Sequence, residues 1–204
     1  MSAFFADRNV VLEDERVRLR PLVPADVDAL AEIALDPAIW QFFVASIQTR
    51  DDLQRFVDEA VESTRAGTAL AFTVVDKASG AVAGSTRFGN LSARDQRVEV
   101  GWTWLGRRFV GTGINTRCKH LLMAYAFEQQ GVQRTEFKTD VLNQPARRAL
   151  LKVGCTEEGV LRSHTLMPGG RRRDTIYYSV LAGEWPGVKQ RLGDLLKAGG
   201  GGRC

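Results

Sequence analysis

The sequence predicts an α+β protein built on a mixed, mostly antiparallel central sheet of about seven strands, with helices flanking the sheet. Two observations lead to this prediction. Apolar side chains recur with a period of two in some segments and with helical spacing in others. In chain order these segments run strand, helices, three strands, helix, strand, helix and two strands, which is not the regular βαβ alternation of a parallel sheet.

The N-terminal part contains one strand and two helices. Residues 16–22 (RVRLRPL) alternate apolar and basic side chains, as a half-buried strand does. Pro24 and the acidic residues after it open a short helix over 24–34. A second helix follows Thr49, where apolar residues recur along one helical face. These residues are Leu53, Phe56, Val57, Ala60 and Val61.

Three consecutive strands follow. Residues 69–76 and 81–91 are separated by a turn at 78–80 and are predicted to form an antiparallel hairpin. Residues 97–105 (RVEVGWTWL) are rich in Val, Trp and Thr, which favour strands.

The next segments are one helix and one strand. Apolar residues from Ile114 to Tyr125 recur at helical spacing, and this helix is expected to end near Gly131. Residues 135–141 (TEFKTDV) are predicted to form a strand.

The C-terminal part closes the sheet. A short helix over 143–153 has Asn143 as its N-cap and Gly154 at its end. Two closing strands are expected within 160–167 and 172–185, followed by a helix from about Glu184.

Length and composition fit one domain, which we expect over residues 1–197, followed by a flexible glycine-rich tail over 198–204. Hydrophobic residues make up 44% of the 204 residues, enough for a core without a structural metal or disulfide. The three cysteines form no CxxC pair, which argues against a disulfide framework or a zinc site. No apolar run resembles a signal peptide or a membrane span, so we expect a cytoplasmic protein with no membrane partner.

The formal charge is +4, from 28 basic and 24 acidic residues. Arginines cluster at 107–108, 147–148 and 171–173. A nucleic-acid binder would be expected to carry a larger continuous basic stripe, so we expect local sites for anionic ligands and no nucleic-acid partner. Steep salt dependence of oligonucleotide binding would support the opposite view.

The segment GRRFVGTGINTR, residues 106–117, has the composition of a phosphate-binding loop. It is not a Walker A loop, because Thr112 stands where the lysine is required, and it is not a dinucleotide fingerprint, because Thr116 replaces the third glycine. Gly111 and Gly113 allow close approach of a ligand, and the amides of the following helix N-terminus can bind phosphate. The alternative is a glycine turn that only changes the chain direction.

Four segments together resemble the GNAT superfamily of N-acetyltransferases, in its ribosomal-protein N-terminal (Rim-type) branch. They are VEVGWTWL (98–105), GTGINT (111–116), LNQPARRALLKVGC (142–155) and RDTIYYSVLAGEW (173–185). The resemblance spans roughly Glu15 to Leu192. It implies a sheet that splays at the cofactor site, acetyl-coenzyme A as co-substrate, and a pyrophosphate-binding pattern Q/R-x-x-G-x-G/A.

Two registers fit this pattern. Arg108 in the first place matches it literally, whereas the helical phase beginning at Ile114 favours the register from Val110 to Asn115, which departs at both ends. The resemblance also implies carbonyl-binding amides near Trp104, a pantetheine contact at Asn143 (or simple N-capping) and adenosine-phosphate contacts from Arg147 (or a solvated side chain). The implied cofactor-binding set is Trp104, Leu105, Arg108, Val110, Gly111, Thr112, Gly113, Ile114, Asn115, Thr116, Asn143 and Arg147.

Glu99 is the candidate general base. It is an isolated acid in a strand whose neighbours Val98 and Val100 point to the other face. The Rim-type members place a glutamate in this strand, where it acts through water. The alternatives are a solvated side chain or an ion pair with Arg87 or Arg97.

The proton donor for the departing thiol is unassigned. Relatives carry a tyrosine or a serine on the helix after the asparagine, and the matching positions here are Leu150 and Ala146. Because a thiol pKa is about 8.5, the thiolate can leave unassisted or take a proton from water.

The acceptor site is expected near the early segment that covers the acceptor in relatives. The aromatic residues there are as often core as pocket wall, and His164 is either a second proton carrier or an ordinary surface or core histidine. The candidate acceptor-binding residues are Trp40, Phe43, Arg87, Trp102 and His164.

These features predict an N-acetyltransferase in which a primary amine attacks acetyl-CoA directly, without a metal. The acceptor is a protein N-terminus or a small-molecule amine, and a homodimer is compatible with the sequence, although no feature of the sequence supports it. Cys118 and Cys155 are expected to be core residues, because a nucleophilic cysteine needs an adjacent base. The alternative function, suggested by the missing proton donors, is a catalytically degenerate acyl-CoA-binding or regulatory protein of the same fold.

Overall fold

The computed structural model describes residues 4–200, with side chains through residue 198. Its centre is one eight-stranded sheet in the order β1-β2-β3-β4-β5-β6-β8-β7. Among the paired strands of this part of the chain, β5 and β6 run parallel and all other neighbours are antiparallel. The strands are β1 (Leu12–Glu13), β2 (Val17–Pro21), β3 (Leu70–Asp76), β4 (Val82–Ser92), β5 (Arg97–Leu105), β6 (Arg134–Asp140), β7 (Thr156–Leu166) and β8 (Arg172–Leu181).

The predicted α+β class and mixed, mostly antiparallel sheet are confirmed. The eighth strand is β1, whose two residues are too few to show a period in the sequence. The helical elements are η1 (Pro24–Asp26), α1 (Val27–Ala34), α2 (Pro37–Trp40), α3 (Arg50–Arg65), η2 (Arg107–Phe109), α4 (Ile114–Ala124), η3 (a π-helical turn, Tyr125–Gln129), α5 (Gln144–Val153) and α6 (Trp185–Gly200).

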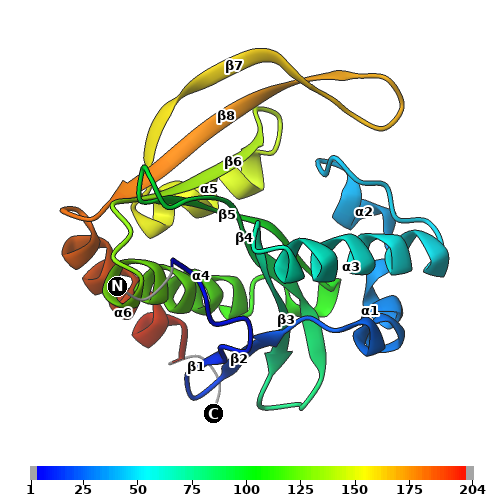
Figure 1. The fold of residues 1–204 in the computed structure, drawn as a ribbon, viewed down its shortest axis with the longest axis horizontal. Coiled ribbons are helices and arrows are strands. Elements are labelled where there is room, and N and C mark those ends of the chain that lie inside the picture. Colours follow the sequence, from blue (N-terminus) through cyan, green and yellow to red (C-terminus); the bar gives the residue numbers. More distant parts are fainter. Residues whose placement is uncertain (1–3, 201–204) are drawn as a thin grey trace.

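Helices cover both faces of the sheet, and each face has its own core (Figure 1). A smaller core joins α1, α2 and α3 to β3 and β5 through residues such as Leu30, Leu53 and Trp104. A larger core on the other side joins the sheet to α4, α5 and α6, with Phe88 and Tyr178 fully buried in it. The β7–β8 hairpin extends beyond the rest of the sheet and arches over it in Figure 1.

Capping residues fix the helix ends that position the site. Thr49 accepts a hydrogen bond from the Asp52 amide and starts α3 with a capping box. Asn143 Oδ1 accepts from the Ala146 amide and starts α5, which ends at Gly154 with φ of 106°. In contrast, the N-cap position of α4 is occupied by Gly113, which has no side chain to cap the helix.

The sheet opens between β5 and β6. Their parallel pairing covers Arg97–Glu99 against Arg134–Glu136, and beyond Glu99 the two strands separate. In the same stretch β5 carries a bulge against β4, and Trp102 takes the left-handed φ of 49° that is unusual for a bulky residue. The predicted splay of the sheet is therefore confirmed at this position.

Several boundaries differ from the sequence expectation. β7 begins at Thr156, four residues before the expected strand, because pairing with β8 extends the strand through polar residues. The short helix α2 has too few residues for a periodic signal. The expected tail over 198–204 starts within α6, which runs to Gly200, and residues 201–204 lie outside the described part of the chain.

Candidate active site

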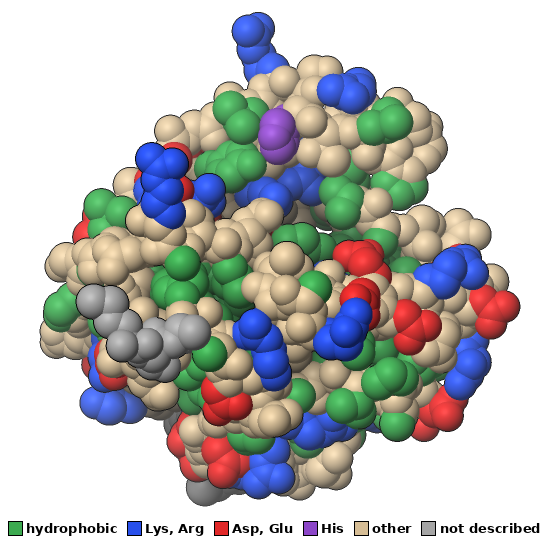
Figure 2. Space-filling view, viewed as in Figure 1, with side chains coloured by type: hydrophobic (Ala, Val, Ile, Leu, Met, Phe, Trp, Pro, Cys, Tyr) green, Lys and Arg blue, Asp and Glu red, His purple; other side chains and the backbone are tan. Residues whose placement is uncertain are grey.

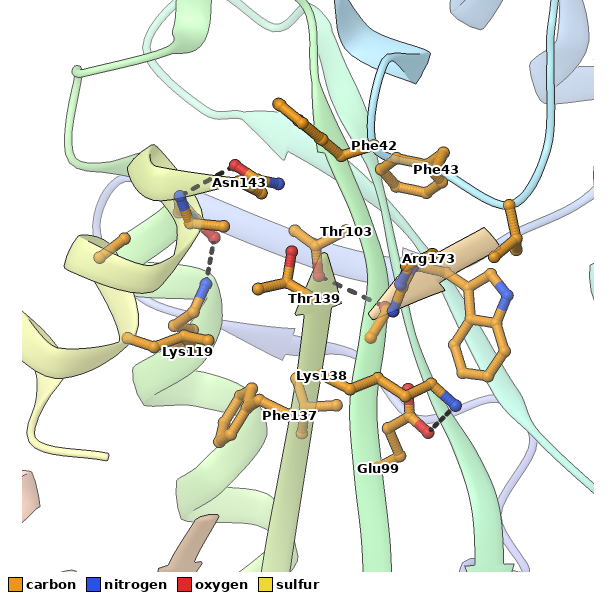
Figure 3. A pocket seen from close by; sticks show the side chains of 18 of the residues that line it. Phe42, Phe43, Glu99, Thr103, Lys119, Phe137, Lys138, Thr139, Asn143 and Arg173 are labelled. Carbon is orange, nitrogen blue, oxygen red and sulfur yellow. Dashed lines mark hydrogen bonds and ion pairs between the residues drawn. The ribbon is translucent and has the colours of Figure 1, made fainter. Parts of the chain in front are cut away.

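A pocket of about 290 Å³ lies where β5 and β6 separate (Figure 3). The separated strands form its floor, α4 and α5 form one side, and the segment after α2 lies on the opposite side. Its polar and aromatic lining comprises Phe42, Phe43, Glu99, Trp102, Thr103, Asn115, Lys119, Phe137, Lys138, Thr139, Asn143, Thr165 and Arg173.

Glu99 is buried, 4% exposed, and its carboxylate lines this pocket. Asn90 Nδ2 donates to Glu99 Oε2 at 2.6 Å, and Lys138 Nζ lies 2.9 Å from the same oxygen. A Cβ on Gly101 would lie 2.9 Å from Glu99 Oε1, so glycine leaves space for the carboxylate. The expected ion-pair partners Arg87 and Arg97 instead contact Glu59, Asp95 and Glu136.

Trp102 forms the wall beside Glu99. The Arg87 guanidinium lies 4.9 Å from the Trp102 ring centroid, and Lys138 Nζ lies 5.7 Å from the same ring. The ring packs over Gly89, where a Cβ would lie 2.5 Å from it. Arg87 itself is buried beneath the pocket wall, with Glu59 Oε1 at 3.5 Å, and burial lowers the pKa of its guanidinium.

A second buried cation, Lys119, lies on the helical side of the pocket. Lys119 is 8% exposed, and its ammonium donates to Asn115 Oδ1 at 2.7 Å, one helical turn earlier on α4. Burial lowers the pKa of Lys119 from its ordinary value. Asn115 occupies the position where the family pattern expects glycine or alanine. Here its side chain accepts a hydrogen bond from Lys119.

The glycine loop has the geometry expected of a phosphate cradle. Gly111 and Gly113 both have positive φ, 79° and 88°, and a Cβ on either would meet nothing within 4 Å. Ile114 is fully buried as the first residue of α4. The first-turn amides of α4 lack intrahelical partners and receive no side-chain cap, so this helix end can accept an anion.

The other predicted cofactor-binding residues differ in exposure. Arg108 and Val110 are exposed, and the Thr112 hydroxyl donates to the Phe109 carbonyl within the loop. Thr116 is half-buried in the first turn of α4. Asn143 caps α5, as the N-cap interpretation predicts, and it also lines the pocket, where the pantetheine contact stays a prediction.

Arg147 lies outside the pocket. Its guanidinium donates to the Tyr178 hydroxyl at 3.2 Å and to the Val141 carbonyl at 3.1 Å. These contacts tie α5 to β8 and leave no pocket contact in this arrangement.

The end of β5 carries the candidate carbonyl-binding amides. The Gly106 amide donates to the Ala83 carbonyl of β4, and amides alternate in direction along a strand, so the Leu105 amide points toward the gap next to β6. The Trp104 side chain is buried in the core, where its indole nitrogen has no partner among the described residues.

Two of the five candidate acceptor-binding residues line the pocket, and three do not. Phe43 and Trp102 line the pocket. Trp40 packs in the core under α1 and α3, and its indole donates to the Ala34 carbonyl at 2.6 Å. His164 is exposed on β7, next to Thr175 and Tyr177, and does not line the pocket.

Sequence reasoning missed several residues of the site, among them the pocket-lining Lys119, Lys138 and Arg173 and the Glu99 partner Asn90. Lys119 had a usable signal, since it lies four residues after Asn115 between the apolar positions Cys118 and Leu122. Asn90 and Lys138 meet Glu99 from other strands, and nothing local indicates this. The buried Arg173 stands among three consecutive arginines, and the sequence cannot distinguish which one points inward.

Both described cysteines lie in the larger core. Cys118 and Cys155 are buried, and burial raises the pKa of each thiol to about 12. Residues 4–198 contain no cluster of His, Cys, Asp and Glu side chains able to hold a metal. No helix of the described chain is both long and apolar enough to cross a bilayer.

Known proteins are similar to this chain over most of its length. The family model for the acetyltransferase (GNAT) domain matches residues 16–156. The chain is 29% identical over 182 residues to "Putative ribosomal N-acetyltransferase YdaF" of Bacillus subtilis, which covers 86% of this chain and 97% of that protein.

Solved structures agree. A GCN5-related N-acetyltransferase from Brucella melitensis superposes with a TM-score of 0.84 at 30% identity, covering 91% of this chain and 85% of that one. RimJ of Mycobacterium smegmatis, solved in complex with CoA-disulfide, shares the fold with a TM-score of 0.77 at 23% identity, over 88% of each chain. These matches confirm the predicted resemblance, and the chain belongs to the GNAT acetyltransferase family.

Proposed function

We propose that this protein transfers an acetyl group from acetyl-CoA to a primary amine by direct attack. The observation that carries the proposal is the Glu99 carboxylate, buried in a pocket where β5 and β6 separate and held by Asn90 and Lys138. A proton acceptor fixed at this point lies beside the gap that a thioester would enter.

The co-substrate is bound at the start of α4. The uncapped helix end and the positive-φ glycines Gly111 and Gly113 accept the pyrophosphate. The pantetheine arm lies between the separated ends of β5 and β6, next to Asn143. The Leu105 amide donates to the acetyl carbonyl.

Glu99 removes the proton from the attacking amine, directly or through a water molecule. A lysine or α-amine is largely protonated at neutral pH, since their pKa values are about 10.4 and 8, so a base raises the attacking fraction. As the N–C bond forms, the C–S bond breaks and the thiolate leaves.

Lys119 stabilises the departing thiolate in place of the absent tyrosine and serine. Its ammonium lines the same pocket as Leu150 and Ala146, which occupy the usual donor positions. Asn115 orients the ammonium, and burial strengthens its interaction with a developing negative charge. Lys119 then transfers a proton to the thiolate, so CoA leaves as the thiol. Afterwards Lys119 regains a proton from solvent and Glu99 releases its proton to solvent.

The proposal is tested by thiol release from acetyl-CoA across a panel of amines. We expect release that depends on both protein and amine, with formation of the N-acetyl product. The degenerate acyl-CoA-binding alternative predicts cofactor binding with no thiol released above background by any amine, in the native protein as in a Glu99→Gln variant.

The proposed pyrophosphate site at Gly111, Gly113 and the start of α4 gives a separate prediction. Gly113→Ala should weaken CoA binding by about tenfold, because a side chain enters the phosphate approach and the left-handed backbone costs about 1 kcal/mol. Isothermal titration with CoA measures this effect. Gly80→Ala is the matched control, since Gly80 also has positive φ and open space but lies in the β3–β4 turn. Equal CoA affinity in the two variants would contradict pyrophosphate binding at this loop.

A further inference from the structure

The acceptor side of the pocket carries an arginine without a counter-ion. Arg173 of β8 is 6% exposed and lines the pocket. Its Nε donates to Thr175 Oγ1 at 3.1 Å, and no carboxylate of the described chain lies within 4.0 Å of its guanidinium. A guanidinium has five N–H donors, so most of the hydrogen-bonding capacity of Arg173 is unused.

The nearby acids are occupied by other partners. Asp140 is hydrogen-bonded to Arg171 and accepts from the Leu142 amide. Glu99 is held by Lys138 and Asn90. Burial lowers the pKa of Arg173, and the charges of Asp140 and Glu99 offset this effect only in part. Buried charges in proteins are normally paired. The Arg173 guanidinium can therefore bind an anionic group of a ligand.

The Arg173 side chain is placed where it can contact a ligand in the pocket. In Figure 3 Arg173 lies between Phe43 and the Glu99–Lys138 pair. Figure 2 shows Lys and Arg side chains gathered where the surface is hollowed beneath the β7–β8 hairpin. The pocket lining also contains a second buried cation, Lys119.

This charge pattern discriminates between classes of amine. A polyamine or an aminoglycoside brings several positive charges into a pocket whose lining already holds three cations, Lys119, Lys138 and Arg173, against Glu99 as its one acid. An amine that also carries a carboxylate would place its amine near Glu99 and its carboxylate on Arg173. Arginine binds carboxylates through two parallel hydrogen bonds, which also fixes orientation.

We propose that Arg173 is the carboxylate-binding residue of the acceptor site and that the acceptor is an amine bearing a nearby carboxylate. The carboxylate comes either from a free amino acid or from an acidic side chain at a peptide N-terminus. This inference rests on the proposed acetyl transfer, which it deepens by naming the acceptor class.

The test compares matched acceptors by thiol release. Free amino acids are compared with their carboxamides, peptides with N-terminal Asp or Glu with their Asn or Gln counterparts, and spermidine serves as the cationic probe. We expect kcat/KM to be roughly 10- to 100-fold higher for the carboxylate member of at least one pair, as for hydrogen bonds to charged groups. The responding pair identifies whether the carboxylate is that of a free amino acid or of a peptide side chain.

Arg173→Gln should reduce this preference to about onefold, mainly by raising KM for the carboxylate acceptor with little change in kcat. Arg172→Gln is the matched control, because the neighbouring Arg172 is exposed and contacts Ser163 on the hairpin. Thermal melting and CoA titration of both variants check the fold. If Arg173→Gln does not fold, the comparison of acceptor pairs in the native protein still tests the inference.

The outcomes separate the two proposals. Thiol release with no carboxylate preference, or with spermidine as the best acceptor, overturns the assignment of Arg173 and leaves acetyl transfer standing. A preference that survives Arg173→Gln unchanged also overturns it. No thiol release with any amine overturns the acetyl transfer itself.

Discussion

Glu99→Gln is expected to lower kcat/KM by about 10²- to 10³-fold, within the range typical of general-base catalysis. The amide keeps the shape of the side chain and a hydrogen-bonding oxygen for Asn90, but it cannot take a proton. Because amine and thioester binding do not require the carboxylate charge, the loss should appear in kcat. Steady-state thiol release at saturating acetyl-CoA measures it.

The activity lost in Glu99→Gln should be partly recovered at high pH, where more of the amine is already deprotonated. Glu62→Gln is the control, since Glu62 is exposed on α3 and pairs with Arg65 far from the pocket. Glu99→Gln is expected to fold, because Lys138 remains partly exposed to solvent after losing its partner. Activity within about threefold of the native protein would exclude Glu99 as the base.

Lys119→Met is expected to have opposite effects on activity and stability. Turnover should fall by roughly 10- to 100-fold, because the thiolate then leaves without a nearby positive charge. The free energy of unfolding should rise by about 1–2 kcal/mol, since an apolar side chain of similar length replaces a buried ammonium. Stopped-flow thiol release and urea denaturation measure the two quantities.

The pH dependence of both effects follows from the lowered pKa of Lys119. The ammonium is lost as pH rises through this lowered value, so the activity advantage of the native protein over Lys119→Met should shrink in that range. In the same range the unfolded chain binds more protons at Lys119 than the folded one, so native stability rises with pH toward the ordinary lysine pKa of about 10.4. The stability gain of Lys119→Met should therefore be larger at neutral than at alkaline pH.

Lys152→Met is the matched control, because Lys152 is exposed near the end of α5. If Lys119→Met loses stability and keeps full turnover, then Lys119 is a structural residue and the thiolate leaves unassisted. If both variants lose activity equally, the effect does not come from the pocket.

The glycine loop is the part of the site that sequence predicts best. Gly111 and Gly113 stand directly before a helical apolar phase, and both have the positive φ for which glycine is preferred. The buried Ile114 agrees with the register in which the pattern ends at Asn115. These features are local in the chain, so spacing alone is enough to predict them.

The sheet around this loop is predictable for the same reason. Strand alternation, the Thr49 cap and the Asn143 cap each depend on a few neighbouring residues. The exceptions are β1 and α2, because elements of two and four residues carry no measurable period.

The chemistry of the pocket depends on contacts distant in sequence and could not be predicted in the same way. Lys138 reaches Glu99 because β5 and β6 pair in parallel, and Asn90 reaches it across the antiparallel β4–β5 ladder. Arg173 becomes a pocket residue because the β7–β8 hairpin turns it inward beside the sheet opening. Such pairings require the strand order and register, which the sequence pattern leaves open.

Direct acetyl transfer is tested most directly by following thiol, acetylated amine and intact protein mass together in one turnover of acetyl-CoA. We predict one N-acetyl product for each thiol released, formed only when the amine is present, with the protein mass unchanged throughout. Thiol released without amine alongside a protein heavier by one acetyl group would contradict direct attack, and tight CoA binding with no thiol released by any amine would contradict the enzymatic function.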